Sequence, residues 1–371
     1  MLTTEQMQPF NDAVNDPLSA ETASKEREII GTLCTYAPEE LIWAAGFHPM
    51  RLFSSKSDIV LAENHLQAYC CSLVRGILED SLAGRLDFLT GTVFPHTCDS
   101  MQRLSDIWRL KGKYKFFADV VLPVKLNTPS ARTYMLDILN TFRTELEAAG
   151  GRPILEQDLH EAIHLFNRIR RSLRALYDIK SQNPSIISGA DLYTLVKGSM
   201  IMDKVQAADR LEQLVSTLMP VDTPENDTGR VILSGSVCDS AAYYQVIESA
   251  DVQVVADDLC TGQRWFDGEI EDQIDPMAAI ADRYMDRMIC PAKHSDLTIR
   301  GEHLASLAKK HRAGGVVFLL LKFCDPHAFD YPYLKEFLET RGIKTLRIEV
   351  DEQQDNAGQI TTRIETFAHM I

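Results

Sequence analysis

The sequence predicts an α/β protein built from two parallel-sheet domains of similar topology. Apolar strands alternate with helices from residue 29 to about residue 124, and the alternation returns from residue 229. Long helical patterns occupy the stretch between them. Such alternation is typical of parallel sheets with crossover helices. We therefore expect two Rossmann-like (flavodoxin-like) domains joined by helices, with these divisions: 1–28, a helical entry; 29–128, the first α/β domain; 129–228, a helical middle region; 229–371, the second α/β domain.

The first α/β domain is predicted from three stretches of sequence. Its first strand lies in REIIGTLCTY, and the next stretch, APEELIWAAGF, is a helix. Pro38 suits the first turn of that helix, and Glu39 and Glu40 suit the positive end of its dipole. The stretch LDFLTGTVFPHTCDSMQRLSDIW then predicts a strand, a turn containing Cys98 and a second helix, and YKFFADVVLPV predicts the last strand.

The middle region and the second domain are predicted from the same kinds of sequence pattern. Two long stretches predict helices that connect or cover the sheets: SARTYMLDILNTFRTELEAAG and DLHEAIHLFNRIRRSLRALYDI. Strands return in RVILSGSVCDSAAYYQVIESA, VQVVADDLCTG, GGVVFLLLKFCDP and KTLRIEVD. The apolar run 316–321 is typical of a parallel strand that is buried on both faces. Because ligands collect at the carboxyl ends of such strands, Cys324 is a candidate ligand.

Two pairs of segments repeat between the halves. GTLCTYAPEELI and GSVCDSAAYYQVI share a glycine, two residues, a cysteine and then a helix. GTVFPHTCDSMQRL and VVFLLLKFCDPHAF share an apolar strand that ends in Cys-Asp before a helix. Two domains of similar topology explain this internal repeat most simply. We expect their sheet ends to face each other across a cleft.

Composition narrows the possible partners and the compartment. The formal net charge of −15 argues against nucleic acid or an anionic membrane surface, because both would repel the chain. The N-terminus has neither the basic start nor the apolar stretch of a secretory signal, and no run reaches the roughly 18 apolar residues of a membrane span. We expect a cytoplasmic protein whose 8 cysteines are metal ligands, reactive thiols or core residues rather than structural disulfides.

Six of the cysteines form two groups at similar spacing, namely Cys34, Cys71 and Cys98 in the first half and Cys260, Cys290 and Cys324 in the second. Most of them follow predicted strands, and the thiolate ligands of an iron-sulfur cluster can come from several such loops. The absence of a CxxC pair argues against a zinc ribbon, a thioredoxin motif or a ferredoxin-type run. A lone cysteine is more often a small core residue, so we place Cys70 and Cys238 in the core.

These motifs resemble the family of 2-hydroxyacyl-CoA dehydratases and ATP-dependent benzoyl-CoA reductases, specifically their iron-sulfur subunits. The resemblance covers almost the whole chain, through CTYAPEELIWAAGFHP, YCCSLVRGILEDSLAGRLDFLTGTVFPHTCDSMQRL, VILSGSVCDS, VVADDLCTGQRWF, KFCDPHAFDYPYLKEFLETRGI and IEVDEQQDNAGQITTRIETF. It implies a 4Fe-4S cluster held by Cys71, Cys98 and Cys324 in the cleft between the domains. With three protein ligands, one iron would stay open to a substrate oxygen or water.

The resemblance also implies a mechanism and partners. A separate ATP-hydrolysing iron-sulfur activator delivers an electron at low potential, and the cluster passes it to the carbonyl of an acyl-CoA thioester to give a ketyl radical. Dehydratases then expel the hydroxyl and recycle the electron, whereas reductases consume electrons to reduce an aromatic ring. A homologous subunit would complete a heterodimer or homodimer. The chain has no GxxxxGK[ST] loop and no GxGxxG after a strand, which fits a subunit that depends on ATP hydrolysis by a separate protein.

Cys34, Cys260 and Cys290 depart from the simplest three-cysteine pattern. They resemble the extra cysteines of double-cubane cluster proteins, in which six thiolates hold an 8Fe double cubane and the activity is on small molecules. Two alternatives therefore stay open. The chain could be a double-cubane reductase that pairs with itself, or a non-catalytic subunit that relays electrons to a catalytic partner.

Two residues are candidates for catalysis. Glu39, with Glu40 beside it, could supply a base or a hydrogen bond near the cluster, although an acidic first helical turn explains both residues as well. His96 could donate a hydrogen bond to a cluster sulfur or to substrate, or could simply pack in its turn. His294 and His327 are weaker candidates of the same kind.

Basic residues at two places could meet phosphate groups. The run RIRRSLR could bind the phosphates of CoA or form a solvated helix face; it contains Arg168, Arg170, Arg171 and Arg174. Arg264 and Trp265 follow a predicted strand end, where Arg264 could pair with a phosphate and Trp265 could cover the cluster.

Overall fold

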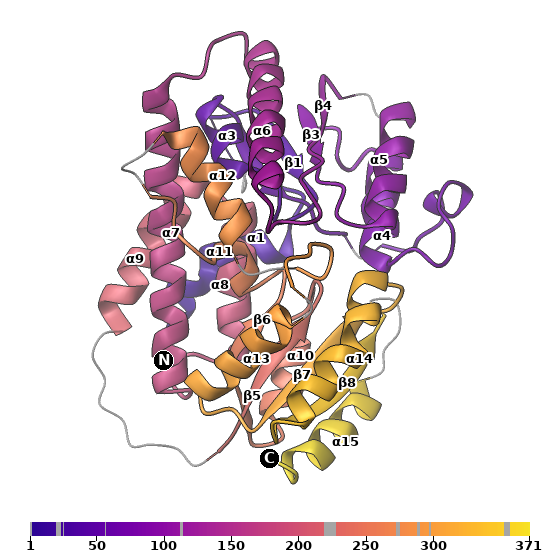
Figure 1. Cartoon of the computed structure of the whole chain (residues 1–371), viewed down its shortest axis with the longest axis vertical. Helices are drawn as coiled ribbons and strands as arrows, with labels where there is room; N and C mark the ends of the chain where they lie inside the picture. The colour runs from indigo at the N-terminus through magenta and orange to yellow at the C-terminus, as the bar shows by residue number, and fades with distance from the viewer. Residues whose placement is uncertain are drawn as a thin grey trace.

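The computed structural model describes residues 2–19, 24, 26–55, 57–111, 114–218, 228–271, 275–287, 290–296, 298–351 and 357–371. Within these ranges the chain forms two four-stranded sheets, and the strand pairs of both are parallel. The first sheet lies at one end of the molecule and the second at the other (Figure 1). The prediction of two α/β domains with similar parallel sheets is confirmed. Parts of the predicted entry, middle region and last segment lie outside the described residues: 20–23 with 25, 219–227, and 352–356.

The first sheet has the order β2-β1-β3-β4. Its strands are β1 Ile29–Thr32, β2 His48–Arg51, β3 Gly91–Phe94 and β4 Phe116–Asp119. The strand β2 has no strand-like pattern, because its sequence HPMR carries two basic residues and a proline. All four residues are nevertheless buried, and the ring of His48 bonds the carbonyl of Ile201 at 3.0 Å. Burial against the middle helices and pairing with β1 thus override a weak local preference.

The second sheet repeats this order as β6-β5-β7-β8. Its strands are β5 Gly229–Gly235, β6 Val252–Asp258, β7 Gly315–Leu321 and β8 Lys344–Val350. Every residue of β7 is buried, as its continuous apolar run predicts. In both sheets the strand order reverses between the two central strands, β1 with β3 and β5 with β7. Ligands of open α/β sheets bind outside the carboxyl ends at this reversal.

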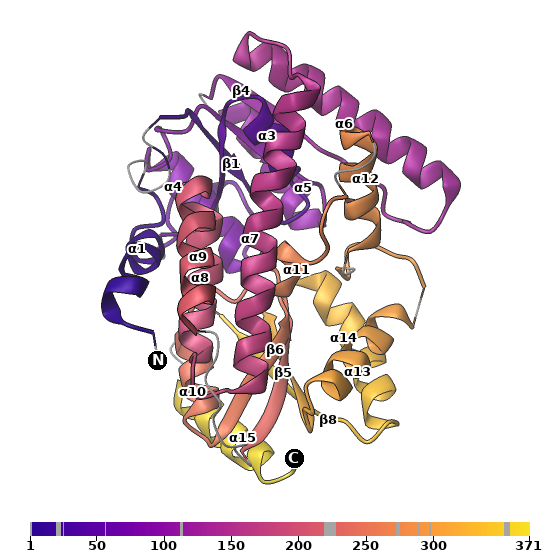
Figure 2. The same cartoon turned by 90° about the vertical axis from the view of Figure 1, so that its left-hand side faces the viewer.

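The helical middle region consists of α6 Pro129–Gly150, α7 Glu156–Gln182, α8 Gly189–Ile201 and α9 Lys204–Leu218. The helix α7 runs alongside both halves of the molecule (Figure 2). It packs against α9 and also against β6 of the second sheet. The entry helix α1, Thr4–Asn15, buries Met7, Phe10 and Ala13 and packs on α8. The middle helices therefore link the two sheets into one body.

Short helices follow most strands and complete the layers. These are α3 Glu39–Ala44, η1 Ala62–Asn64, α4 Ser72–Leu82, α5 Asp99–Lys111, α10 Ala242–Glu248, α11 Gln263–Phe266, α12 Pro276–Asp286, α13 Ile299–Lys310, α14 Asp325–Glu339 and α15 Ala357–Ala368. No described helix is both long and apolar enough to cross a lipid bilayer.

The segment around α12 crosses from the second half of the sequence to the first half of the structure. Its helix packs on α6 and α7 (Figure 2). The Tyr284 hydroxyl donates to the carbonyl of Ala37 at 2.8 Å, and Arg287 Nη1 donates to the carbonyl of Thr35 at 2.8 Å. Further along, the backbone of His294 bonds both Val124 and Leu126 at 2.7 Å. These bonds hold the carboxyl ends of the two sheets in a fixed relation.

We expect Gly235→Ala to destabilise the second sheet. A Cβ at this position would lie 2.0 Å from the backbone oxygen of Leu319 on the paired strand. Neither backbone can move without breaking the pairing, so the free energy of unfolding should fall by about 2 to 3 kcal/mol in urea titrations. The control is Gly358→Ala in α15, where a Cβ meets nothing within 4 Å. Equal stability of both variants would contradict this account of strand packing.

Candidate functional site

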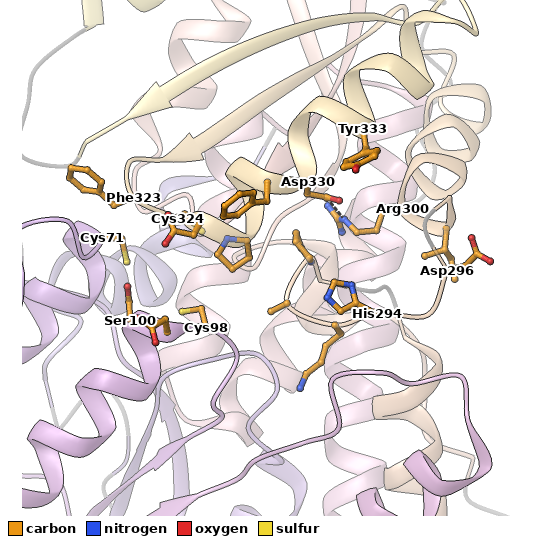
Figure 3. A pocket seen from close by; sticks show the side chains of 18 residues that line it. Cys71, Cys98, Ser100, His294, Asp296, Arg300, Phe323, Cys324, Asp330 and Tyr333 are labelled. Atoms are coloured by element: carbon orange, nitrogen blue, oxygen red, sulfur yellow. Dashed lines mark hydrogen bonds and ion pairs between the residues drawn. The ribbon is translucent and has the colours of Figure 1, made fainter.

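A cavity of about 470 Å³ lies where the two sheets' carboxyl ends face each other. Cys71 and Cys98 enter it from the first half of the chain, and Cys324 enters it from the second half (Figure 3). Apolar side chains cover much of the remaining wall, among them Pro291, Ala292, Ile299, Phe323, Phe329 and Tyr333. The structure therefore brings the three cysteines of the resemblance to one cavity.

The three cavity cysteines share one local setting. Cys71 and Cys324 are the residues that cap the N-termini of α4 and α14, and Cys98 directly precedes α5. The exposed backbone N–H groups and the dipole of a helix N-terminus favour negative charge. Each helix N-terminus thus favours an anionic group bound to the thiol, although burial outweighs this effect for the free thiols of Cys98 and Cys324.

The backbone before Cys324 is strained. Phe323 has a φ of 65°, in the left-handed region that residues with a side chain avoid at a cost of roughly 1–2 kcal/mol. This conformation turns the chain at the end of β7, and the amide of Cys324 then bonds the carbonyl of Leu321 at 3.0 Å. Such strain persists where surrounding structure imposes it and is common at ligand sites. Here it turns the chain where β7 ends and Cys324 enters the cavity.

Burial dominates the electrostatics of Cys98 and Cys324. Burial raises the pKa of each thiol to about 12. Both therefore keep their protons at neutral pH unless a cation replaces the proton and supplies the missing charge. A metal centre would do so at both positions.

The second group of cysteines lies beside the first. Burial, with a smaller contribution from the thiols of Cys290 and Cys34, raises the pKa of Cys260 to about 11, although the Arg264 guanidinium opposes the rise. The same two thiols contribute to the raised pKa of Cys98. Such mutual effects require the thiols to be close together. Burial also disfavours the thiolate of Cys34, but the neighbouring Arg51 guanidinium and hydrogen bonds outweigh burial and lower its pKa.

Among the residues that the structure describes, no three His, Cys, Asp or Glu side chains are close enough to share one metal ion. In a cluster each thiolate binds a different iron, so its ligands stand further apart. Cys70 and Cys238 are buried in the hydrophobic core and do not line the cavity, as predicted for core thiols.

The two predicted catalytic residues lie away from the cavity wall. Burial raises the pKa of Glu39, and its Oε2 accepts a hydrogen bond from Trp265 Nε1 at 2.6 Å. His96 Nε2 faces Asp119 Oδ1 at 2.7 Å. Neither residue lines the cavity, so their catalytic roles stay predictions without support from its geometry. Of the weaker candidates, His294 lines the cavity, and His327 Nδ1 lies 3.3 Å from Cys324 Sγ.

The basic run on α7 already has carboxylate partners within this chain. Arg170 is buried and pairs with Glu40, which corrects the expectation of a solvated face at this position. Its guanidinium, with that of Arg283, outweighs burial and lowers the pKa of Glu40. The other arginines pair with surface carboxylates: Arg168 with Asp209 and Glu212, and Arg171 and Arg174 with Glu269.

The wall of the cavity opposite the cysteines was not predicted from the sequence. It holds Arg300, which pairs with Asp330 at 2.6 Å and with buried Asp258 at 3.0 Å (Figure 3). Phe329 and Tyr333 are 79% and 68% exposed on the same helix, one turn apart. In the sequence, the available signal was the pair of aromatic residues Phe329 and Tyr333, four positions apart and shortly after Cys-Asp-Pro.

Two parallel sheets with opposed carboxyl ends and convergent thiols define a two-domain α/β protein with a thiol-lined interdomain site. The family described as 2-hydroxyglutaryl-CoA dehydratase, D-component, matches residues 34–371, and the chain belongs to this family of 2-hydroxyacyl-CoA dehydratase and benzoyl-CoA reductase subunits.

Similar proteins extend over nearly the whole chain. The (R)-phenyllactyl-CoA dehydratase beta subunit of Clostridium sporogenes is 26% identical, over 98% of this chain and 97% of its own. A benzoyl-CoA reductase subunit of Thauera aromatica is 27% identical, over 94% and 92%. The (R)-2-hydroxyglutaryl-CoA dehydratase subunit beta of Acidaminococcus fermentans is 25% identical, over 95% and 94%.

Stability should fall as Asp257, beside the Cys260 loop, ionises. Burial raises its pKa to about 6, although Tyr177 and the amides of Leu259 and Gln263 donate to it. Because the unfolded carboxyl titrates near pH 3.9, the folded state loses roughly 2 to 3 kcal/mol as pH rises from about 4 to about 6.

Urea titrations across this pH range test the effect, with Asp257→Asn as the comparison. The asparagine keeps an acceptor for the amides and does not titrate, so its free energy of unfolding should fall less over this interval. Identical pH profiles of the two proteins would show that Asp257 does not titrate in the folded state as stated.

Proposed function

We propose that the chain is the iron-sulfur subunit of an acyl-CoA enzyme of the 2-hydroxyacyl-CoA dehydratase or benzoyl-CoA reductase type. Its cofactor would be a 4Fe-4S cluster bound by Cys71, Cys98 and Cys324. The observation that carries the proposal is the position of these cysteines, which come from both halves of the chain and line one cavity. The names of its relatives support the reaction class.

A cluster bound here would act as a one-electron reductant. One of its irons would have no protein ligand and could bind a substrate oxygen. The chain's own residues would hold and enclose it. The N-termini of α4, α5 and α14 stabilise its negative charge. The aromatic side chains of Phe323 and Phe329 offer an apolar surface that packs against an acyl group and limits water access.

The proposed substrate is a CoA thioester that accepts one electron and forms a ketyl radical. The proposed partners are a homologous subunit and a separate ATP-hydrolysing iron-sulfur activator. The relatives are named as subunits, which supports the first partner. The lack of a nucleotide-phosphate loop in the sequence is consistent with the second.

A specific observation also favours a second candidate function. Cys34, Cys260 and Cys290 lie close enough to the proposed ligands to alter their pKa values. If these thiols bind iron too, the chain would hold an 8Fe double cubane and reduce small molecules. The Cys290→Ser variant separates the two candidates. It should lose about half of its iron if the chain holds a double cubane, and none if the chain holds a single cubane.

Neighbouring cysteines provide a matched test of the proposed ligands. Cys71 lines the cavity, whereas the neighbouring buried Cys70 does not. After anaerobic purification, Cys71→Ser should lose most of its bound iron because serine is a poor ligand for the cluster. Cys70→Ser should keep the iron content of the unchanged protein.

The two substitutions are at adjacent positions in the chain, so a general folding defect would affect both variants. Circular dichroism and a urea titration establish that each is folded before iron is measured. If Cys71→Ser, Cys98→Ser and Cys324→Ser all kept the iron content of the unchanged protein, the ligand assignment would be overturned.

A further inference from the structure

Arg264 is a fully buried arginine at the carboxyl edge of the second sheet. It lies on α11 and is 0% exposed. Its Nε donates to Asp258 Oδ1 at 2.7 Å, and its Nη2 donates to the carbonyls of Gly235, at 2.5 Å, and Asp258. Its Nη1 contacts Cys260 Sγ at 3.3 Å and His327 Nε2 at 3.3 Å.

These contacts engage every donor of the guanidinium. An arginine carries five N–H groups and no acceptor, and the five contacts of Arg264 match them in number. No N–H remains for a phosphate, which corrects the expectation that Arg264 meets one. Trp265 likewise donates its N–H to Glu39 instead of lying over the cavity.

The contact with Arg264 fixes the protonation pattern of the His327 ring. Because Arg264 can only donate, its contact with His327 Nε2 is a hydrogen bond only in the tautomer whose Nε2 is the unprotonated acceptor. The proton of the neutral ring therefore lies on Nδ1. That nitrogen is 3.3 Å from Cys324 Sγ, so the ring donates an N–H to this sulfur.

A buried ion network holds Arg264 in place. Asp258 is 0% exposed and also bonds Arg300 at 3.0 Å and the Ser234 hydroxyl at 2.9 Å. Arg300 is fixed in turn by Asp330 at 2.6 Å. The guanidinium of Arg264 cannot rotate away from the two sulfur-directed contacts without breaking bonds to buried partners.

We propose that Arg264 is a positioning residue that directs N–H donors to two cysteine sulfurs, to Cys260 directly and to Cys324 through the tautomer of His327. The inference rests on the proposed function, since it treats Cys324 as a cluster ligand. Hydrogen bonds to ligand sulfurs stabilise the reduced, more negative state of a cluster. Arg264 and His327 therefore raise the reduction potential of the bound cluster.

The first test is the ¹⁵N NMR spectrum of the imidazole rings in the full chain labelled at its 10 histidines and purified without iron. His327 should show the Nδ1–H tautomer, and its signal is assigned by its loss in His327→Asn. An Nε2–H tautomer or a doubly protonated ring would overturn the inference. This readout does not depend on the cluster.

The second test compares His327→Leu with His327→Asn in anaerobically purified, iron-loaded protein. The side-chain NH₂ of asparagine can reach the position of Nδ1 and keep the donor, whereas leucine removes it. In a redox titration followed by electron paramagnetic resonance, His327→Leu should shift the potential to more negative values and His327→Asn should restore most of that shift. Equal potentials for all three proteins would overturn the inference.

The two tests separate this inference from the proposed function. If the unchanged protein binds no iron, the proposed function fails, and the tautomer in the iron-free chain still decides the role of Arg264. If iron content is normal in both His327 variants and the potential does not move, the cluster assignment stands and the positioning role fails.

Discussion

The site depends on one constraint: the carboxyl ends of two separate sheets are held facing each other. Bonds from the α12 segment impose this arrangement, through Tyr284 and Arg287 to the first half and through the backbone of His294 to the loop after β4. Together with the middle helices, which pack on both sheets, they place Cys98 and Cys324 on one cavity. The same constraint explains why thiols so far apart in sequence share one cavity and why α12 packs across the division that the sequence predicts at residue 229.

Buried charge next to the thiols supplies rigidity at that edge. Although burial opposes its ionisation, Arg264 and Arg300 hold the pKa of Asp258 well below its usual value, so all three stay charged. A buried ion network of this kind does not stabilise a fold strongly by itself, but losing one member is costly. The network fixes the orientation of the Arg264 guanidinium. One nitrogen of this planar group contacts both Cys260 and His327, a geometry that lysine cannot reproduce.

Much of the fold could be predicted because its signals are local. The continuous apolar run of β7 and the repeated Gly-x-x-Cys and Cys-Asp segments indicated two equivalent parallel sheets and the strand ends that carry cysteines. Features that depend on distant partners could not be predicted. The strand β2 forms because β1 and the middle helices bury it, Arg170 is buried because Glu40 lies opposite, and the Arg300 wall exists only once α13 and α14 lie side by side. His96 illustrates the limit, since its spacing from Cys98 pointed to the cavity but its ring faces Asp119.

The most direct test of the central claim is a count of iron and acid-labile sulfide per chain after anaerobic purification, with electron paramagnetic resonance of the reduced protein. A cluster held by Cys71, Cys98 and Cys324 predicts about four irons and four sulfides per chain. About eight irons would extend the ligand set to Cys34, Cys260 and Cys290 and indicate the double cubane. Protein that folds normally and binds neither iron nor sulfide would contradict the claim.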